Sequence, residues 1–205
     1  MPYEYRKLTP EERQEIVLYR VAQKYPLHAP PHPFRFEGAY LLTAVNYEHK
    51  PIMHSPRRRT EFETRLLAAM KEIAKEVIAW VVLANHYHVL VNIESLDDVS
   101  AVLKSLHGTT SHEWNKEDGL TGKRRVWYKF FDTYIRNDSH LHTAFNYIHY
   151  NPVKHGYVTD AYEWDWSSLP LYYSHNGGEW LRENWRKHKP SADFGKGWDD
   201  DTVPP

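Results

Sequence analysis

Two apolar segments separated by a single asparagine constrain the fold of this chain more than any other feature. Residues 77–84 (VIAWVVLA) form a continuous apolar run, which is typical of a buried strand. After Asn85, residues 86–93 (HYHVLVNI) alternate in character, which indicates the second strand of a β-hairpin. Neither run is long enough to cross a bilayer, and the mean hydropathy is -0.73, so we expect no transmembrane helix.

The segments around this hairpin predict an α+β fold. Their order along the chain is β-α-β-β-α-β-α, and its first six elements match the ferredoxin-like plan. That plan is an antiparallel sheet with helices packed on one face, to which a C-terminal helix is added here. The other predicted strands cover residues 39–47 and 126–135, and the predicted helices cover residues 57–76, 96–114 and 139–150, the last ending at Asn151 and Pro152.

The 205 residues divide into one principal domain and three flanking segments. The absence of cysteine excludes disulfides and thiolate metal sites. The polar N-terminus shows no signal-peptide pattern, so we expect a cytoplasmic protein. The predicted segments are an N-terminal helix with a proline-rich linker (1–33), the principal domain (34–159), an aromatic extension (160–190) and an acidic, disordered tail (191–205).

A pair of histidines lies at the start of the second hairpin strand. His86 and His88 are two residues apart, so their side chains project from the same face, opposite the more apolar face that carries Tyr87. Two neutral imidazoles suit a divalent metal if a third ligand is available. The alternative is two ordinary surface histidines, since the chain contains 14 of them.

The last predicted helix carries a second stripe beside its apolar one. At about 100° per residue, Ala144, Tyr147 and Asn151 fall on the flank of the stripe that faces the core. A tyrosine hydroxyl in this position can be held firmly and still reach a substrate, and the amide oxygen of Asn151 can be a metal ligand. The alternative is an aromatic residue at the rim of the core and a residue that ends the helix.

The net charge of -1 excludes a uniformly basic polymer binder but conceals a local asymmetry. Residues 120–159 carry six basic and two acidic side chains, whereas residues 191–205 carry four Asp and one Lys. Aromatic residues are interleaved with the basic ones, which suits contact with a nucleic-acid backbone and base stacking. A solvated surface is the alternative. The predicted DNA-binding residues are Lys123, Arg124, Arg125, Lys129, Arg136 and Lys154, with a second cluster of Arg57, Arg58 and Arg59 at a helix start.

Three stretches together resemble a known family. The sequences WVVLANHYHVLV, VWYKFFDTYIRND and FNYIHYNPVKHGYV are similar to those of the REP-associated tyrosine transposases, which belong to the HUH nuclease superfamily. The resemblance covers residues 34–166 in the right order. One departure is Tyr87, which stands between the two histidines where a purely apolar residue is more usual. Its hydroxyl therefore needs a partner inside the core.

The resemblance implies a metal-dependent enzyme that cleaves and rejoins single-stranded DNA at hairpin-forming palindromic repeats. Tyr147 would be the nucleophile, and His86, His88 and Asn151 would hold Mg²⁺ or Mn²⁺. The tyrosine would become attached to the 5′ phosphate and leave a free 3′ hydroxyl, and no ATP would be needed for rejoining. We further expect a monomer, with a dimer as the alternative. The protein would not bind membranes and would associate with the nucleoid through DNA.

Two other functions are compatible with the same pattern. One is a non-catalytic module that binds single-stranded nucleic acid on a ferredoxin-like sheet, which would need aromatic residues on the open face. The other is a metalloenzyme acting on a small molecule, which would need a carboxylate near the histidines. The nearest acids in the sequence, Glu94 and Asp97, lie at the far end of the strand. The acidic tail could also fold over a basic groove and restrain it.

Overall fold

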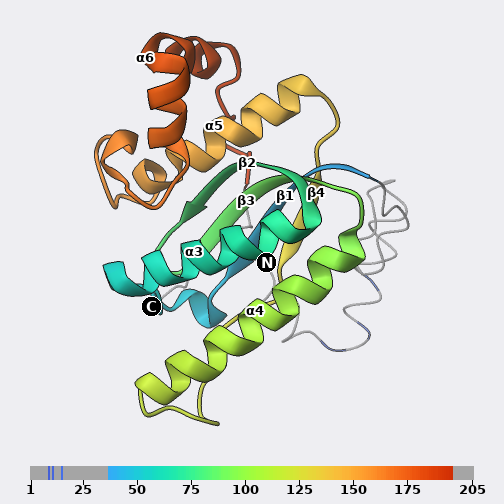
Figure 1. Ribbon diagram of the computed structural model, residues 1–205, viewed down its shortest axis with the longest axis vertical. Coiled ribbons are helices and arrows are strands. Elements are labelled where there is room, and N and C mark those ends of the chain that lie inside the picture. The colour runs from blue at the N-terminus through green and yellow to red at the C-terminus, as the bar shows by residue number, and fades with distance from the viewer. Residues whose placement is uncertain (1–8, 10, 12–14, 16–36, 196–205) are drawn as a thin grey trace. The chain divides into compact units, whose positions relative to one another are not determined.

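The computed structural model describes residues 37–195, together with Thr9, Glu11 and Glu15 (Figure 1). Residues 37–195 belong to one compact unit. The predicted N-terminal helix, the proline-rich linker and residues 196–205 of the acidic tail lie outside the described residues. Within the described part, no helix is long and apolar enough to cross a membrane.

A four-stranded antiparallel sheet forms the centre of this unit, in the order β2-β3-β1-β4. The predicted hairpin joins β2 to β3, and the amide of Leu83 donates to the carbonyl of His86 at 2.8 Å across its turn. The α+β ferredoxin-like prediction is therefore confirmed. The strands are β1 (Gly38–Val45), β2 (Ala74–Val82), β3 (His86–Ile93) and β4 (Phe131–Tyr134).

The fourth strand is shorter than its sequence predicts. Only Phe131–Tyr134 pair with β1, whereas β-forming residues begin at Val126. The reason is that β1 ends at Val45, where the chain turns into the short helix η1 (Tyr47–His49). The residues before Phe131 meet this end through an isolated bridge between Asn46 and Trp127. Its backbone bonds run from the Tyr128 amide to the Val45 carbonyl at 2.9 Å and from the Tyr47 amide to the Val126 carbonyl at 2.8 Å.

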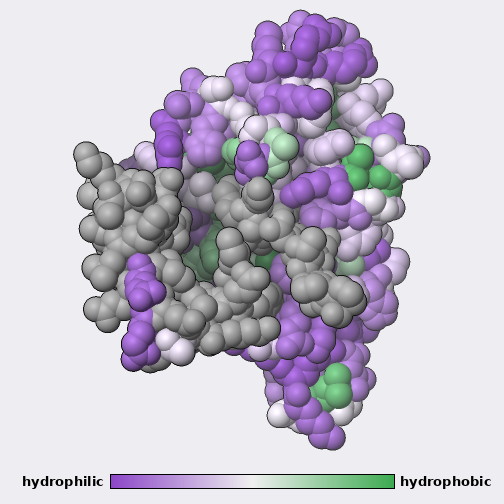
Figure 2. All heavy atoms as spheres, turned by 180° about the vertical axis from the view of Figure 1, so that it is seen from behind, coloured by the Kyte–Doolittle hydropathy of each residue, from purple (hydrophilic) through white to green (hydrophobic). Residues whose placement is uncertain are grey.

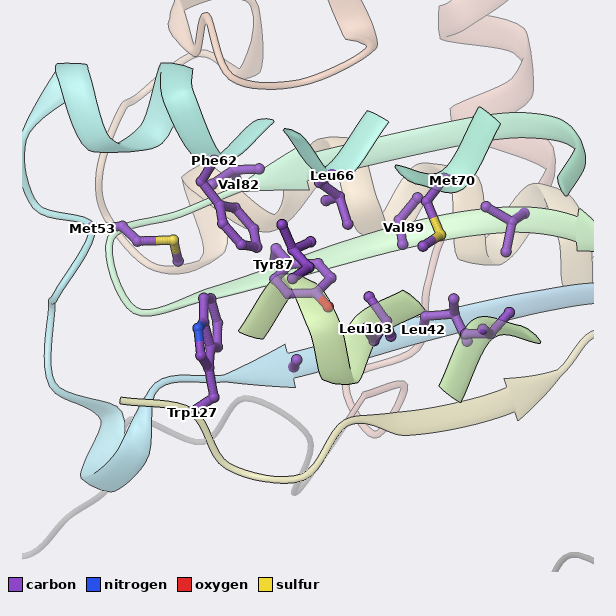
Figure 3. Close-up of a cluster of buried hydrophobic side chains, with 14 of the residues drawn as sticks. Leu42, Met53, Phe62, Leu66, Met70, Val82, Tyr87, Val89, Leu103 and Trp127 are labelled. Carbon is purple, nitrogen blue, oxygen red and sulfur yellow. The ribbon is translucent and has the colours of Figure 1, made fainter. Parts of the chain in front are cut away.

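One face of the sheet packs against α3 (Pro56–Ile73) and α4 (Leu96–Glu117). The odd-numbered residues of β3 point into this first core, as the alternation of the strand predicts. Figure 3 shows Tyr87 surrounded by apolar side chains from both helices and from the segment before β4. Its hydroxyl lies 3.0 Å from Nε2 of His107, which supplies the partner that a buried tyrosine requires.

The opposite face of the sheet carries a second core. Leu41 and Leu90 meet Phe145 and Ile148 from α5 (Asp138–Lys154). A further helix, α6 (Leu169–Lys187), adds Leu181 to this core, although the sequence of this segment is turn-rich and weakly periodic. The upper part of the surface in Figure 2 is largely hydrophilic, and α6 buries Leu169 and Leu181 but leaves Leu171 and Tyr173 exposed. The sheet is therefore covered by helices on both faces.

Helix α5 runs past the proline that we expected to end it. The helix continues from Asn151 through Pro152 to Lys154. A proline near the last turn removes a single hydrogen bond, and the end of the helix is held by other bonds. The amide of His155 donates to the carbonyl of Asn151 at 3.0 Å, and that of Tyr157 donates to Pro152 at 2.9 Å. Asn151 is consequently fixed in helical geometry, on the same side as Tyr147.

Two histidines of the cores are held neutral by their burial. Desolvation lowers the pKa of His107 to about 4 and that of His149 to about 3. In the unfolded chain both regain the ordinary value of about 6.5. The folded state therefore binds fewer protons than the unfolded state at mildly acidic pH.

We predict that the free energy of unfolding falls as the pH drops below about 6.5, because the unfolded chain gains protons that the folded chain excludes. Each histidine contributes a loss of up to about 1.4 kcal/mol per pH unit until its folded pKa is reached. His107→Gln keeps a polar group facing Tyr87 and should remove about half of this loss. Urea denaturation at about pH 7 and about pH 5.5, followed by tryptophan fluorescence, measures the difference. The prediction would be contradicted if the free energy of unfolding fell equally in both proteins between the two pH values.

Candidate active site

The two histidines of the predicted metal site lie on the face of β3 that α5 covers. The side chains of His86 and His88 have no exposed surface, and their ring centroids are 5.1 Å apart. They are therefore not ordinary surface histidines. The position follows from alternation within β3, because Tyr87 between them points into the opposite core.

A neighbouring side chain fixes each imidazole through its Nδ1 atom. Nδ1 of His88 lies 2.7 Å from Oγ1 of Thr43 on β1, and Nδ1 of His86 lies 2.7 Å from Oδ1 of Asn85. The amide nitrogen of Asn85 donates to the carbonyl of His49 at 3.3 Å, which orients its oxygen toward His86. Because an amide oxygen only accepts, the contact with Asn85 uses Nδ1 of His86 as the donor and leaves Nε2 directed toward α5.

Asn151 joins the two histidines from α5. Its Oδ1 lies 2.9 Å from Nε2 of His86, and its side chain is fully buried. An imidazole nitrogen from β3 and an amide oxygen from α5 therefore meet at this point. Two imidazoles and one amide oxygen also match the ligand types of divalent metals. In residues 37–195 no three His, Asp or Glu side chains form a metal-binding cluster, and the role of Asn151 as a third ligand stays a prediction.

Tyr147 lies one helical turn before Asn151. Its ring centroid is 5.2 Å from that of His88, and the side chain is buried. The ammonium group of Lys154 donates to the Tyr147 hydroxyl at 3.3 Å and lies 5.0 Å from the centre of the ring. A positive charge beside the hydroxyl stabilises the negative charge that develops on a tyrosine oxygen when it acts as a nucleophile. The structure thus places Lys154, predicted as a DNA-binding residue, beside the candidate nucleophile.

A segment beyond α6 covers Tyr147. The sequence suggested that this tail could fold over a basic groove, but it did not indicate a contact with Tyr147. The Phe194 ring lies 5.2 Å from the Tyr147 ring. Gly195, with a φ of +80°, places its backbone against the hydroxyl so closely that a Cβ atom there would overlap it. A phosphate approaching this hydroxyl must therefore displace the segment.

His155 is a second residue that we did not single out. It follows the last turn of α5, and its ring centroid is 4.9 Å from that of His86. Because α5 ends at Lys154, the helical periodicity of the sequence does not predict the direction of the His155 side chain.

The arginine cluster at the start of α3 is bound largely by the protein itself. The side chain of Arg58 is only 7% exposed and donates to Glu117 at 2.9 Å and to Asp118 at 2.6 Å. The bond to Asp118 raises the pKa of this guanidinium further above neutrality. Arg57 is exposed and pairs with Glu61 and Glu117. These acids compensate the charges that would otherwise oppose the helix dipole.

Arg59 is also buried, but without an acidic partner in the described part of the chain. Its Nη1 donates to the carbonyls of Met53 and His54, and its guanidinium lies 3.9 Å from the centre of the Trp166 ring. Desolvation lowers its pKa. These contacts give Arg58 and Arg59 structural partners, whereas their DNA-binding role stays a prediction.

The predicted DNA-binding residues between positions 123 and 136 are more accessible than Arg58 and Arg59. Arg124 is bonded to Asp118 at 2.8 Å, but its neighbour Arg125 extends over aromatic rings instead. Lys123, Lys129 and Arg136 are exposed and form no ion pair with any described residue. The cations available to an external anion thus lie mainly between α4 and α5.

Comparison with known proteins places this chain in a family. The sequence model described as "Transposase IS200 like" matches residues 39–151. A putative REP-associated tyrosine transposase from Haemophilus influenzae is 31% identical over 118 residues, which are 53% of this chain and 67% of that protein. A REP-associated tyrosine transposase from Escherichia coli is 32% identical over 96 residues, which are 46% of this chain and 54% of that protein.

A solved structure shares the fold. It is a REP-associated tyrosine transposase bound to a REP hairpin, and it aligns with a TM-score of 0.56 at 21% identity over 72% of this chain and 87% of the other. The matched family segment contains β1 from Ala39 onward, all of β2 to β4, and the part of α5 that carries Tyr147 and Asn151. This chain therefore belongs to the family of IS200-like transposases.

Proposed function

We propose that this protein cleaves and rejoins single-stranded DNA at hairpin-forming palindromic repeats, with Tyr147 as the nucleophile. The observation that carries the proposal is the convergence of Tyr147 and Asn151, on one side of α5, with the two buried histidines of β3. The names of the relatives support the substrate, since both are called REP-associated and the solved relative is bound to a REP hairpin.

The proposed reaction is a transesterification. The Tyr147 oxygen attacks the scissile phosphorus, an O–P bond to the tyrosine forms, and the bond between phosphorus and the 3′ oxygen breaks. The proton lost by the tyrosine is balanced by the one gained by the leaving 3′ hydroxyl. Lys154 stabilises the negative charge on the attacking oxygen. Because the phosphotyrosine is still a phosphodiester, attack by a 3′ hydroxyl reverses the step without ATP.

A divalent ion is part of this proposal. Mg²⁺ or Mn²⁺ held by His86, His88 and Asn151 would supply positive charge beside the scissile phosphate. Thr43 and Asn85 would orient the two imidazoles toward it, because their contacts are made with the Nδ1 atoms. Glu94, one of the acids considered for a small-molecule enzyme, is instead paired with Lys75 beyond the other end of β3.

The nucleophile is tested by a matched pair of tyrosine variants. Tyr147→Phe should abolish the covalent protein–DNA adduct while binding is retained, because only the attacking oxygen is lost. Tyr150→Phe should form the adduct normally, because this side chain is exposed and packs against Trp185. The measurement is a denaturing gel with a hairpin oligonucleotide labelled at its 3′ end, in Mg²⁺ or Mn²⁺. An adduct that persists in Tyr147→Phe would show that another residue attacks.

The metal site is tested without reference to catalysis. Thr43→Val removes the hydroxyl that orients His88 and should weaken Mn²⁺ binding by about 10- to 100-fold. Thr64→Val is the control, because its hydroxyl bonds only to the carbonyl of Thr60 within α3, and it should leave Mn²⁺ binding unchanged. Titration calorimetry or the paramagnetic resonance of free Mn²⁺ gives the affinities. Equal affinities in the two variants would refute this arrangement.

The cover over Tyr147 gives a further prediction. Truncation after Pro190 and Phe194→Ala should both raise the initial rate of adduct formation several-fold, because they increase the fraction of molecules with an accessible hydroxyl. Truncation after Gly195 keeps the contact with Tyr147 and removes most of the acidic residues of the tail. It therefore tests the effect of the tail's charge separately from that of the contact. If Phe194→Ala cleaves at the wild-type rate, the contact does not restrain the enzyme.

A further inference from the structure

The sheet face that carries His86 and His88 is covered unevenly by α5. Helix α5 packs mainly over β2 and β3. Thr43, which bonds to His88, is paired with Phe131 of β4, and directly paired residues of neighbouring strands lie on the same face. Phe131 therefore lies across β1 from the catalytic histidines, on their side of the sheet.

Phe131 belongs to a row of three nearly parallel rings, which we call the aromatic row: Tyr47, Tyr128 and Phe131. The Tyr47 and Tyr128 centroids are 6.5 Å apart with an interplanar angle of 24°, and those of Tyr128 and Phe131 are 6.3 Å apart at 17°. All three side chains are partly exposed. By contrast, Trp127 next to Tyr128 is buried in the first core, where its ring packs against Phe62 at an interplanar angle of 31°. The partly exposed rings of the aromatic row therefore differ from the rings of the packed core.

Positive charge accompanies this row. The guanidinium carbon of Arg125 lies 5.1 Å from the centre of the Tyr47 ring and 5.4 Å from that of Tyr128. Arg125 forms no ion pair with any residue in the described part of the chain, and its Nε donates to the carbonyl of Trp127. Lys129, next to Tyr128, is exposed and likewise forms no ion pair there. Arg124, in contrast, is bound to Asp118.

We propose that the aromatic row, with Arg125 and Lys129, binds unpaired nucleotides of the single-stranded DNA that flank the scissile phosphate. Bases would stack on the rings, which accept any base because every base has a π-face. The two cations would contact the adjacent phosphates. Bases in a hairpin stem are already stacked on one another, so this site would distinguish unpaired from paired strands. The assignment to the flank of a cleavage site rests on the proposed function.

The test measures binding by the full-length protein in the presence of a chelator, so that no cleavage occurs. Tyr128→Leu combined with Phe131→Leu keeps apolar packing and removes the rings. This variant should bind a fluorescent unstructured 12-mer about 10-fold or more weakly, but bind an abasic oligonucleotide of the same length and a blunt-ended hairpin as the wild type does. Tyr162→Leu combined with Tyr173→Leu is the control, since these exposed rings contact each other and Tyr173 lies on α6. It should not alter binding.

Arg125→Gln provides a second test on a surface residue, whose replacement does not disturb the core. It should weaken binding of the 12-mer and of the abasic strand alike, and lower the slope of log affinity against log salt by about 1. The proposal would be overturned if Tyr128→Leu with Phe131→Leu weakened binding of the 12-mer and of the abasic strand equally. It would also be overturned if the control, Tyr162→Leu with Tyr173→Leu, lost as much binding. Wild-type salt dependence in Arg125→Gln would overturn it as well.

These outcomes are separate from those of the proposed function. Loss of 12-mer binding in the ring variant, together with no adduct from the wild type, would support the aromatic row and refute the nuclease. An adduct that depends on Tyr147, together with unchanged binding by the ring variant, would support the nuclease and refute the aromatic row.

Discussion

The pairing of β3 with a strand on each side, under helices on both faces, is the constraint on which the rest of the structure depends. Hydrogen bonds to β1 along its whole length fix its register, and a shift by one residue would exchange its two faces. With this register, Tyr87 enters the core beneath α3 and α4 while the two histidines face α5. The same strand thus supplies the centre of the hydrophobic core and the centre of the site.

Burial of the site also explains its polar neighbours. A polar group removed from water is costly unless it has a hydrogen-bonding partner, and His86 and His88 have such partners in Asn85 and Thr43. These contacts use one nitrogen of each ring and thereby orient the other. The hydrogen bonds that compensate the burial of the histidines therefore also orient them for the proposed metal site. Phe194 and Gly195 complete the enclosure around Tyr147.

The nearly neutral total charge has a structural interpretation. Acidic groups at the end of α4 are bonded to Arg57, Arg58 and Arg124, so these cations stabilise the packing of the protein itself. Arg125 and Lys129 have no such partner in the described part of the chain. The charge pattern in the sequence identified a basic region, but only the ion pairs show which of its cations are available to a phosphate.

The sequence by itself determined the features that depend on neighbours a few residues apart. Alternation in β3 placed both histidines on one face, and the helical period of α5 placed Tyr147 and Asn151 on one side. The extent of α5 beyond Pro152, the helix α6 and the short β4 were decided by contacts between distant segments, which no local period records. The same holds for Thr43 beside His88, Lys154 beside Tyr147 and the cover formed by Phe194. Local periodicity sets the direction of a side chain, whereas tertiary packing decides what it meets there.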